Sequence, residues 1–167
     1  MPTSNLDPSY SKLDRLMAAY GMNTNGREMS LRCPNAISLG KNEIPGLQLA
    51  FRGHADVEQN HESTLQIVLW YISEACEDAL DKLEGYPHYY NKTMVPVTYR
   101  GKEYESMIYY MNHEHNYSPP SQRYIRMLEQ GYREHGLDLN QIYSAPGYIT
   151  PEQSRALIPY QSPIKTD

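Results

Sequence analysis

The chain has 167 residues and a formal charge of −5, from 15 Lys and Arg against 20 Asp and Glu. This length fits one domain better than two, and the absence of a basic run longer than a dipeptide argues against a nucleic-acid-binding protein. Because the sequence contains neither an apolar stretch of about 18 to 20 residues nor a secretory signal pattern at its N-terminus, we expect a soluble cytoplasmic protein that does not bind membranes.

Two residue types in the composition carry information about the site and the compartment. The chain contains 16 Tyr against one Phe and one Trp. Since a buried Tyr usually needs a partner for its hydroxyl group, this excess predicts a polar cavity or a wet surface lined by phenol rings. Cys33 and Cys76 are isolated and far apart in the sequence. Two such thiols fit a reducing compartment, so we expect both to remain reduced.

The first half of the chain predicts mostly strands. Residues 1–12 are polar, contain two prolines and are predicted to form a flexible arm before a domain over 13–140. Within the domain, an apolar run ending at Tyr20 predicts a buried strand that leads into a turn-rich loop at 21–26. The elements that we expect next are a short helix over 27–33 and strands over 35–39, 47–52, 55–58 and 64–72.

The second half predicts two principal helices and a hairpin. One helix begins at the N-cap Ser73 and ends at Gly85, and another runs from 121 to 135, before Gly136. Between them, strands over 94–99 and 104–111 flank a glycine-containing turn. Residues 141–167 are predicted to form a proline-rich tail, with one turn of helix over 151–157. This order predicts an α+β domain with a mixed or closed sheet.

Glu84 is the position most indicative of chemistry. It is the last helical residue before Gly85, where the negative end of the helix dipole disfavours an ionised carboxylate. If aromatic rings also desolvate it, both effects raise its pKa toward the range of a general base or acid. The alternative is an ordinary exposed glutamate at a helix end.

Two loops are further candidates for a binding site. The glycine in the segment from Tyr20 to Asn23 lets successive backbone N–H groups turn toward an anion, although a plain turn explains the same residues. Pro119 and Pro120 fix the entry into the last helix and could aim Tyr124, which could equally belong to the core.

The histidines form only weak candidates for chemistry. His113 and His115 would share one face of a continued strand and could form a metal pair, but we expect a solvated strand end because nothing nearby supplies further ligands. His54 and His61 are expected on the surface.

Several segments occur in an order that resembles the γ-glutamylcyclotransferase family. The resemblance covers roughly residues 16–139, and the Glu-Gly-Tyr-Pro sequence with the later diproline makes it specific. The segments that carry it are Tyr20 to Asn23, Arg32 to Ala36, Leu80 to Pro87, Tyr90, and Tyr117 to Tyr124. It implies a small mixed β-barrel flanked by helices and an enzyme that releases 5-oxoproline from γ-glutamyl amides.

The resemblance also implies roles for individual residues. Glu84 would be the general acid and base, and the backbone of Gly21, Met22 and Asn23 would hold the substrate carboxylate or the oxyanion. The other substrate-binding residues would be Tyr20, Tyr90 and Tyr124. Met22 departs from the usual serine of the family, so we expect catalysis to be retained with altered affinity or specificity. Neither a metal nor an organic cofactor is expected.

Two alternative functions stay open. The leaving amine is undefined, so a γ-glutamylamine cyclotransferase acting on a γ-glutamylated biosynthetic intermediate is one alternative. A non-catalytic module that binds a small ligand or a partner on the same fold is the other.

The tyrosines predicted to line the pocket are Tyr20, Tyr86, Tyr90, Tyr117 and Tyr124.

Overall fold

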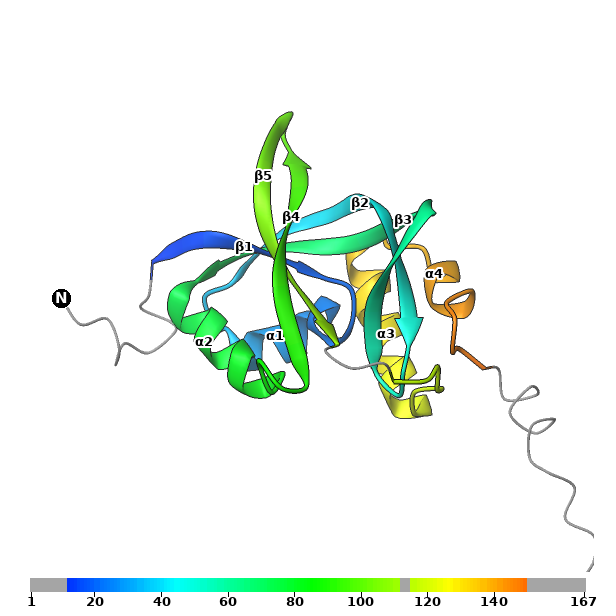
Figure 1. Cartoon of the computed structure of the whole chain (residues 1–167). Coiled ribbons are helices and arrows are strands. Elements are labelled where there is room, and N and C mark those ends of the chain that lie inside the picture. Colours follow the sequence, from blue (N-terminus) through cyan, green and yellow to red (C-terminus); the bar gives the residue numbers. More distant parts are fainter. Residues whose placement is uncertain (1–11, 112–114, 150–167) are drawn as a thin grey trace, which may run out of the picture.

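A five-stranded mixed sheet organises the residues that the computed structural model describes, 12–111 and 115–149 (Figure 1). The strands lie in the order β2-β3-β1-β5-β4, and only the β1–β5 pair is parallel, at Met17 and Met107. Their bounds are β1 Leu13–Ala19, β2 Ile37–Phe51, β3 Ala55–Ser73, β4 Tyr90–Tyr99 and β5 Lys102–Met111. The predicted α+β class with a mixed sheet is confirmed.

The four short strands predicted over 35–72 are in fact two long ones, β2 and β3, paired as a hairpin. The register shifts between Ser38 and Gly40 and again between Pro45 and Leu47. Gly40 and Gly46 both have φ of 85°, a conformation that other residues rarely adopt. Because a bulge adds a residue without ending the ladder, β2 continues through Pro45 and Gly46 and joins the strands predicted over 35–39 and 47–52.

The predicted helix ends are confirmed by their caps. Ser73 Oγ accepts a hydrogen bond from the Cys76 amide, and Ser121 Oγ accepts one from the Tyr124 amide, each at 3.1 Å. Gly136 ends the last long helix with φ of 71°. The helices are η2, a 3-10 turn at Met22–Thr24, and α1 Gly26–Arg32, α2 Glu74–Leu83, α3 Gln122–His135 and α4 Asn140–Tyr143.

Residues 140–149, which overlap the predicted tail, pack against the β2–β3 hairpin. Ile142 in α4 is fully buried, and the Phe51 amide donates to the Pro146 carbonyl at 2.7 Å. The helical turn predicted over 151–157 and nearly all of the predicted arm lie outside the described residues. None of the helices that the structure describes is long and apolar enough to cross a membrane.

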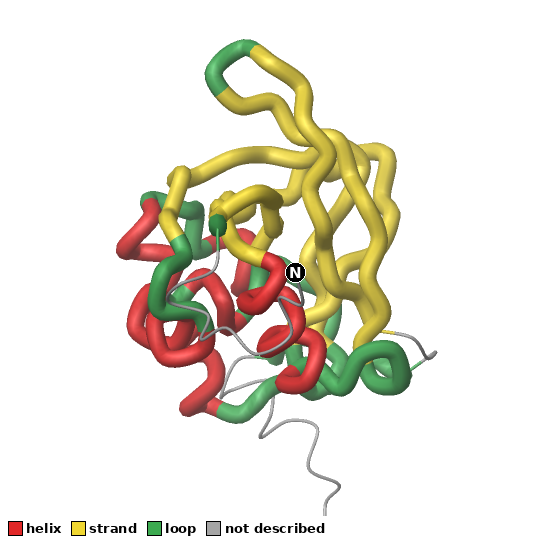
Figure 2. The backbone as a smooth tube through the Cα atoms, turned by 90° about the vertical axis from the view of Figure 1, so that its left-hand side faces the viewer, coloured by secondary structure: helices red, strands yellow, loops and turns green. Residues whose placement is uncertain are grey.

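The sheet curves, but its edges do not join. Asn42 Nδ2 in β2 donates to the Thr98 carbonyl in β4 at 2.6 Å, yet no backbone ladder connects these two edge strands among the described residues. The predicted closure into a barrel is therefore not seen. The helices gather on one side of the sheet, and the β4–β5 hairpin projects beyond it (Figure 2).

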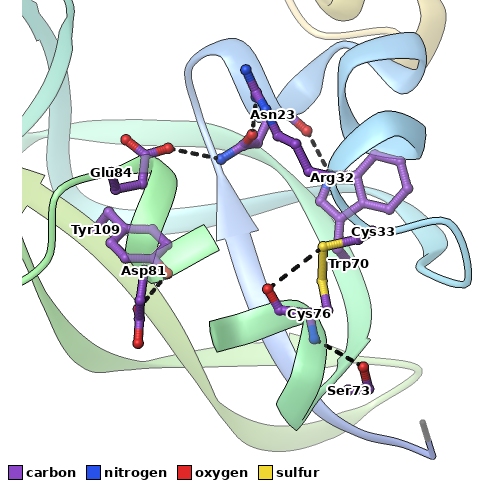
Figure 3. The surroundings of a disulfide bond; sticks show 9 residues. All are labelled: Asn23, Arg32, Cys33, Trp70, Ser73, Cys76, Asp81, Glu84 and Tyr109. Atoms are coloured by element: carbon purple, nitrogen blue, oxygen red, sulfur yellow. Dashed lines mark hydrogen bonds between the residues drawn. A yellow bond between two sulfur atoms is a disulfide. The ribbon is translucent and has the colours of Figure 1, made fainter. Parts of the chain in front are cut away.

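Cys33 and Cys76 form a disulfide bond, so the prediction of two reduced thiols is wrong (Figure 3). The bond joins the end of α1 to the first turn of α2, and both residues are buried. The two cysteines are 43 residues apart in the sequence, but the packing of α1 against α2 brings their Cα atoms to 5.2 Å. Sequence separation alone could not reveal this proximity.

Candidate active site

A cavity of about 370 Å³ opens where the end of β1, the end of α2 and the first turn of α3 meet. It contains every residue that the sequence analysis proposed as catalytic or substrate-binding. Those residues are Tyr20, Gly21, Met22, Asn23, Glu84, Tyr90 and Tyr124. Because they come from three separate segments of the chain, folding is required to assemble them.

The loop after β1 is held in place by side chains from distant elements. Tyr20 Oη donates to the Tyr109 carbonyl at 2.6 Å, and the Tyr20 carbonyl accepts from Tyr132 Oη at 2.8 Å. Trp70 Nε1 donates to the Asn23 carbonyl at 2.9 Å. These buried bonds fix the backbone that carries Gly21 and Asn23 along the cavity wall.

Glu84 is the C-cap residue of α2 and directs its carboxylate into the cavity. Its Oε1 accepts a hydrogen bond from Asn23 Nδ2 at 3.2 Å. Burial raises the pKa of Glu84, and the Asn23 hydrogen bond and the nearby Arg32 charge only partly oppose that effect. Glu84 is thus not an ordinary exposed glutamate at a helix end.

Arg32 orients the asparagine that contacts Glu84 (Figure 3). Its Nη1 donates to Asn23 Oδ1, which leaves the Asn23 amide group to donate to Glu84. Glu28 Oε2 lies 3.4 Å from Arg32 Nη2, one turn earlier in α1. Since an Asn side chain has one acceptor end and one donor end, the Arg32 contact decides which end faces the carboxylate.

Replacing Arg32 by Gln is expected to raise the pKa of Glu84. The change removes a positive charge and loosens the Asn23 amide that stabilises the ionised carboxylate. Titration of the glutamate side-chain carbons by NMR measures this pKa. Arg27→Gln, on the exposed face of the same helix, is the matched control and should leave the titration unchanged. An unaltered Glu84 titration in Arg32→Gln would contradict the account.

Tyr124 presents its hydroxyl hydrogen to the cavity. Its Oη accepts from the Ala55 amide at 3.1 Å. Because the hydroxyl oxygen is the acceptor in this bond, its proton remains to donate to a ligand. Burial raises the pKa of Tyr124 to about 12, so the group stays protonated at neutral pH. A Cβ at Gly21 would lie 3.0 Å from the Ala55 Cβ and 3.3 Å from this oxygen, so a larger residue there would crowd both.

Tyr90 lies beside Tyr124 and is directed differently. Its Oη donates to the Ala55 carbonyl at 2.6 Å, and burial raises its pKa. Because the hydroxyl proton of Tyr90 is used in this backbone hydrogen bond, mainly its ring is available to a ligand in the cavity.

Two tyrosines predicted to line the pocket do not line it. Tyr86 is exposed and stacks with Lys92, whose Nζ lies 4.3 Å from the ring centroid. Tyr117 is also exposed, and its hydroxyl donates to Glu58 at 2.8 Å. Both neighbour site segments in the sequence but face away from the cavity, because adjacency does not determine side-chain direction.

Four polar or aromatic residues of the cavity wall were not predicted to have a role. They are Arg32, His54, Tyr89 and Tyr109. Arg32 belongs to one of the segments that carry the family resemblance, which could have drawn attention to it. Tyr109 lies two residues after Met107 in β5, and both side chains are buried. The alternation of side chains along this strand could have placed Tyr109 on its inward face. His54 is exposed, as predicted, but it lies at the cavity rim and not elsewhere on the surface.

The described part of the chain contains no group of three or more His, Cys, Asp or Glu residues that could hold a metal ion. His113 of the candidate metal pair lies outside the described residues, and His115 contacts the ring of Tyr89 at 6.1 Å between centroids. His61 is exposed on β3.

Comparisons with known proteins found a related family and similar folds. A model of the AIG2-like family matches residues 65–143. Two solved structures, a γ-glutamyl cyclotransferase and the uncharacterized human protein loc79017, are each 25% identical, with TM-scores of 0.68 and 0.66. In both cases the match covers 85% of this chain and 96% of the other.

A third structure shares the fold alone. YkqA from Bacillus subtilis is 21% identical, with a TM-score of 0.64 over 86% of this chain and 52% of its own. Among curated proteins, none matches the sequence significantly.

Proposed function

Since the chain belongs to the AIG2-like and γ-glutamyl cyclotransferase family, we propose that it releases 5-oxoproline from a γ-glutamyl amide. The observation that carries this proposal is Glu84, a carboxylate whose pKa is raised by burial and which faces a cavity. A raised pKa makes the carboxylate a stronger base, and its protonated form can return the proton, as an intramolecular cyclisation requires.

The first step is proton transfer from the substrate to Glu84. A substrate α-amine is an ammonium below a pKa of about 7.7 to 8.0, and only the free amine is nucleophilic. Glu84 accepts one proton from this ammonium, and the nitrogen lone pair then attacks the γ-carbonyl carbon. Because both groups belong to one molecule held in the cavity, little further entropy is lost in reaching the transition state.

The second step needs hydrogen-bond donors for the negative charge that forms on the carbonyl oxygen. In our proposal the Tyr124 hydroxyl and the backbone of Gly21 to Asn23 face that oxygen or the α-carboxylate. Donors fixed in place before reaction stabilise such a charge without reorganisation. The side chain at Met22 remains predicted to affect affinity more than catalysis.

The third step breaks the amide bond. The C–N bond of the tetrahedral intermediate breaks as the leaving amine takes the proton held by Glu84, which gives 5-oxoproline still protonated on its ring nitrogen. That nitrogen then loses its second hydrogen through the ionised Glu84 to the free amine, which departs as an ammonium ion. No water molecule is consumed, and Glu84 returns to its ionised form. Glu84 therefore acts in turn as base and acid, and both protons lost by the α-nitrogen leave with the amine.

Replacing Tyr124 by Phe is expected to lower kcat by about 10²–10³-fold, the usual cost of losing one oxyanion donor. KM should change less, because the donation strengthens in the transition state. Steady-state kinetics on one γ-glutamyl amide provides the measurement. Tyr117→Phe, outside the cavity, is the control and should retain wild-type rates. A kcat within threefold of wild type would exclude this role for Tyr124.

The proposal is tested by incubating the protein with a panel of γ-glutamyl amides and following 5-oxoproline by mass spectrometry. Release of 5-oxoproline with an equal amount of amine is expected. If a γ-glutamyl compound raises the melting temperature but is recovered unchanged after long incubation, the chain is a binding module on this fold and the proposal fails.

A further inference from the structure

The open end of the cavity is lined by apolar and aromatic side chains. Leu83 is 52% exposed and Tyr89 is 39% exposed, and His54 is also exposed, yet all three contribute to the cavity wall. Glu84, Tyr90 and Tyr124, which also line the cavity, are less exposed. If the γ-glutamyl unit occupies the deep part beside Glu84, its leaving amine must point toward these rim residues.

The rings at the rim form a connected wall. His54 Nδ1 lies 3.1 Å from the Tyr89 hydroxyl, which ties the β2–β3 turn to the segment after α2. His54 packs edge-on against Tyr124 at 5.5 Å between centroids, and Tyr89 packs edge-on against Tyr90 at 5.2 Å. Each ring is held by a neighbour, so Tyr89 offers a positioned aromatic surface to a ligand.

The charges of the cavity do not favour a cationic leaving group. Among the described residues of its lining, the charged side chains are Arg32 and Glu84. Arg32 is engaged with Asn23, and Glu84 is required for proton transfer. A lysine-like amine at the rim would therefore meet no spare carboxylate, whereas an aromatic group would meet Tyr89, His54 and Leu83.

We propose that the rim formed by His54, Leu83 and Tyr89 binds an aromatic leaving group, so that the preferred substrates are γ-glutamyl derivatives of aromatic amines or aromatic amino acids. This inference rests on the proposed cyclotransferase activity and specifies its substrate class. The bonds made and broken are those already described, and the amine departs with the proton from Glu84.

The test compares kcat/KM for three substrates: γ-glutamyl-phenylalanine, γ-glutamyl-alanine and Nε-γ-glutamyl-lysine. The aromatic substrate is expected to exceed the alanine substrate by about tenfold, from ring packing alone, and to exceed the lysine substrate further. γ-Glutamyl-anilide then distinguishes an aromatic amine from an aromatic amino acid. Equal values for the first two substrates, or a preference for lysine, would overturn the aromatic subsite but leave cyclotransferase activity intact.

The ratio of kcat/KM for two substrates does not depend on overall activity, so comparing this ratio between variants locates the subsite. Tyr89→Ala should reduce the phenylalanine-to-alanine ratio of kcat/KM to near one. Tyr86→Ala, three residues earlier and outside the cavity, should keep the wild-type ratio. A retained ratio in Tyr89→Ala would overturn the inference. Failure of wild type to release 5-oxoproline from every substrate would overturn the proposed function, and the subsite with it.

Discussion

Glu84→Gln is expected to lower kcat/KM for 5-oxoproline release by about 10²–10⁴-fold, the usual contribution of a general acid and base. Gln keeps the size of the side chain and can still accept the Asn23 hydrogen bond, but it cannot accept and return a proton. Discontinuous assays that quantify 5-oxoproline by mass spectrometry can measure a decrease of this size. Turnover within tenfold of wild type would show that another group moves the proton.

The loss of activity should occur without loss of stability. Folding raises the pKa of Glu84, so its protonated form is favoured in the native state, and its contribution to stability is lost as pH rises through the folded-state pKa. Above the unfolded-state pKa of a glutamate, the raised pKa therefore lowers the stability of the native state, and Glu84→Gln should melt at or above the wild-type temperature. Glu74→Gln, exposed in the first turn of the same helix, is the matched control for activity.

Removing the disulfide is the second change with a large expected effect. For a separation of 43 residues, the chain-entropy model gives about 4 kcal/mol of stabilisation from the Cys33–Cys76 bond. For a chain of this size, that loss corresponds to a fall in Tm of about 8–16 °C. Differential scanning calorimetry of Cys33→Ala/Cys76→Ala should show this decrease.

Reducing the wild-type protein breaks the disulfide bond but keeps both cysteine side chains, so it separates the effect of the bond from the effect of the substitutions. Wild type treated with a reductant under partly unfolding conditions should reach a Tm near that of the double variant. The double variant itself should not respond to the reductant. A wild-type Tm that is insensitive to complete reduction would contradict a stabilising role for the bond. The bond also joins α1, which carries Arg32, to α2, which carries Glu84.

Local sequence signals predicted the helix ends accurately because the groups that satisfy a helix end lie within a few residues. Ser73, Ser121 and Gly136 all act where capping rules place them. The same local reasoning divided β2 into strands over 35–39 and 47–52, because it could not show that pairing with β3 continues the strand through the bulge. Local sequence signals indicate which backbone conformations are accessible, and long-range strand pairing determines which of them the chain adopts.

The site shows the same division between local and distant information. Glu84 was identified from its place at a helix end, and the fold added the burial that raises its pKa. The hydrogen bonds from Arg32 through Asn23 to Glu84 join α1, η2 and α2, so no single segment could reveal them. Tyr117 failed as a wall residue for the converse reason, since it lies near a motif but faces Glu58.

The most direct test of the proposed chemistry is turnover of a γ-glutamyl amide in H₂¹⁸O, with mass analysis of the product. Intramolecular attack by the α-amine uses no water, so the predicted product is 5-oxoproline without ¹⁸O, together with one equivalent of free amine. Glutamate carrying one ¹⁸O atom would show that water attacks the amide, and it would contradict the cyclisation assigned to Glu84.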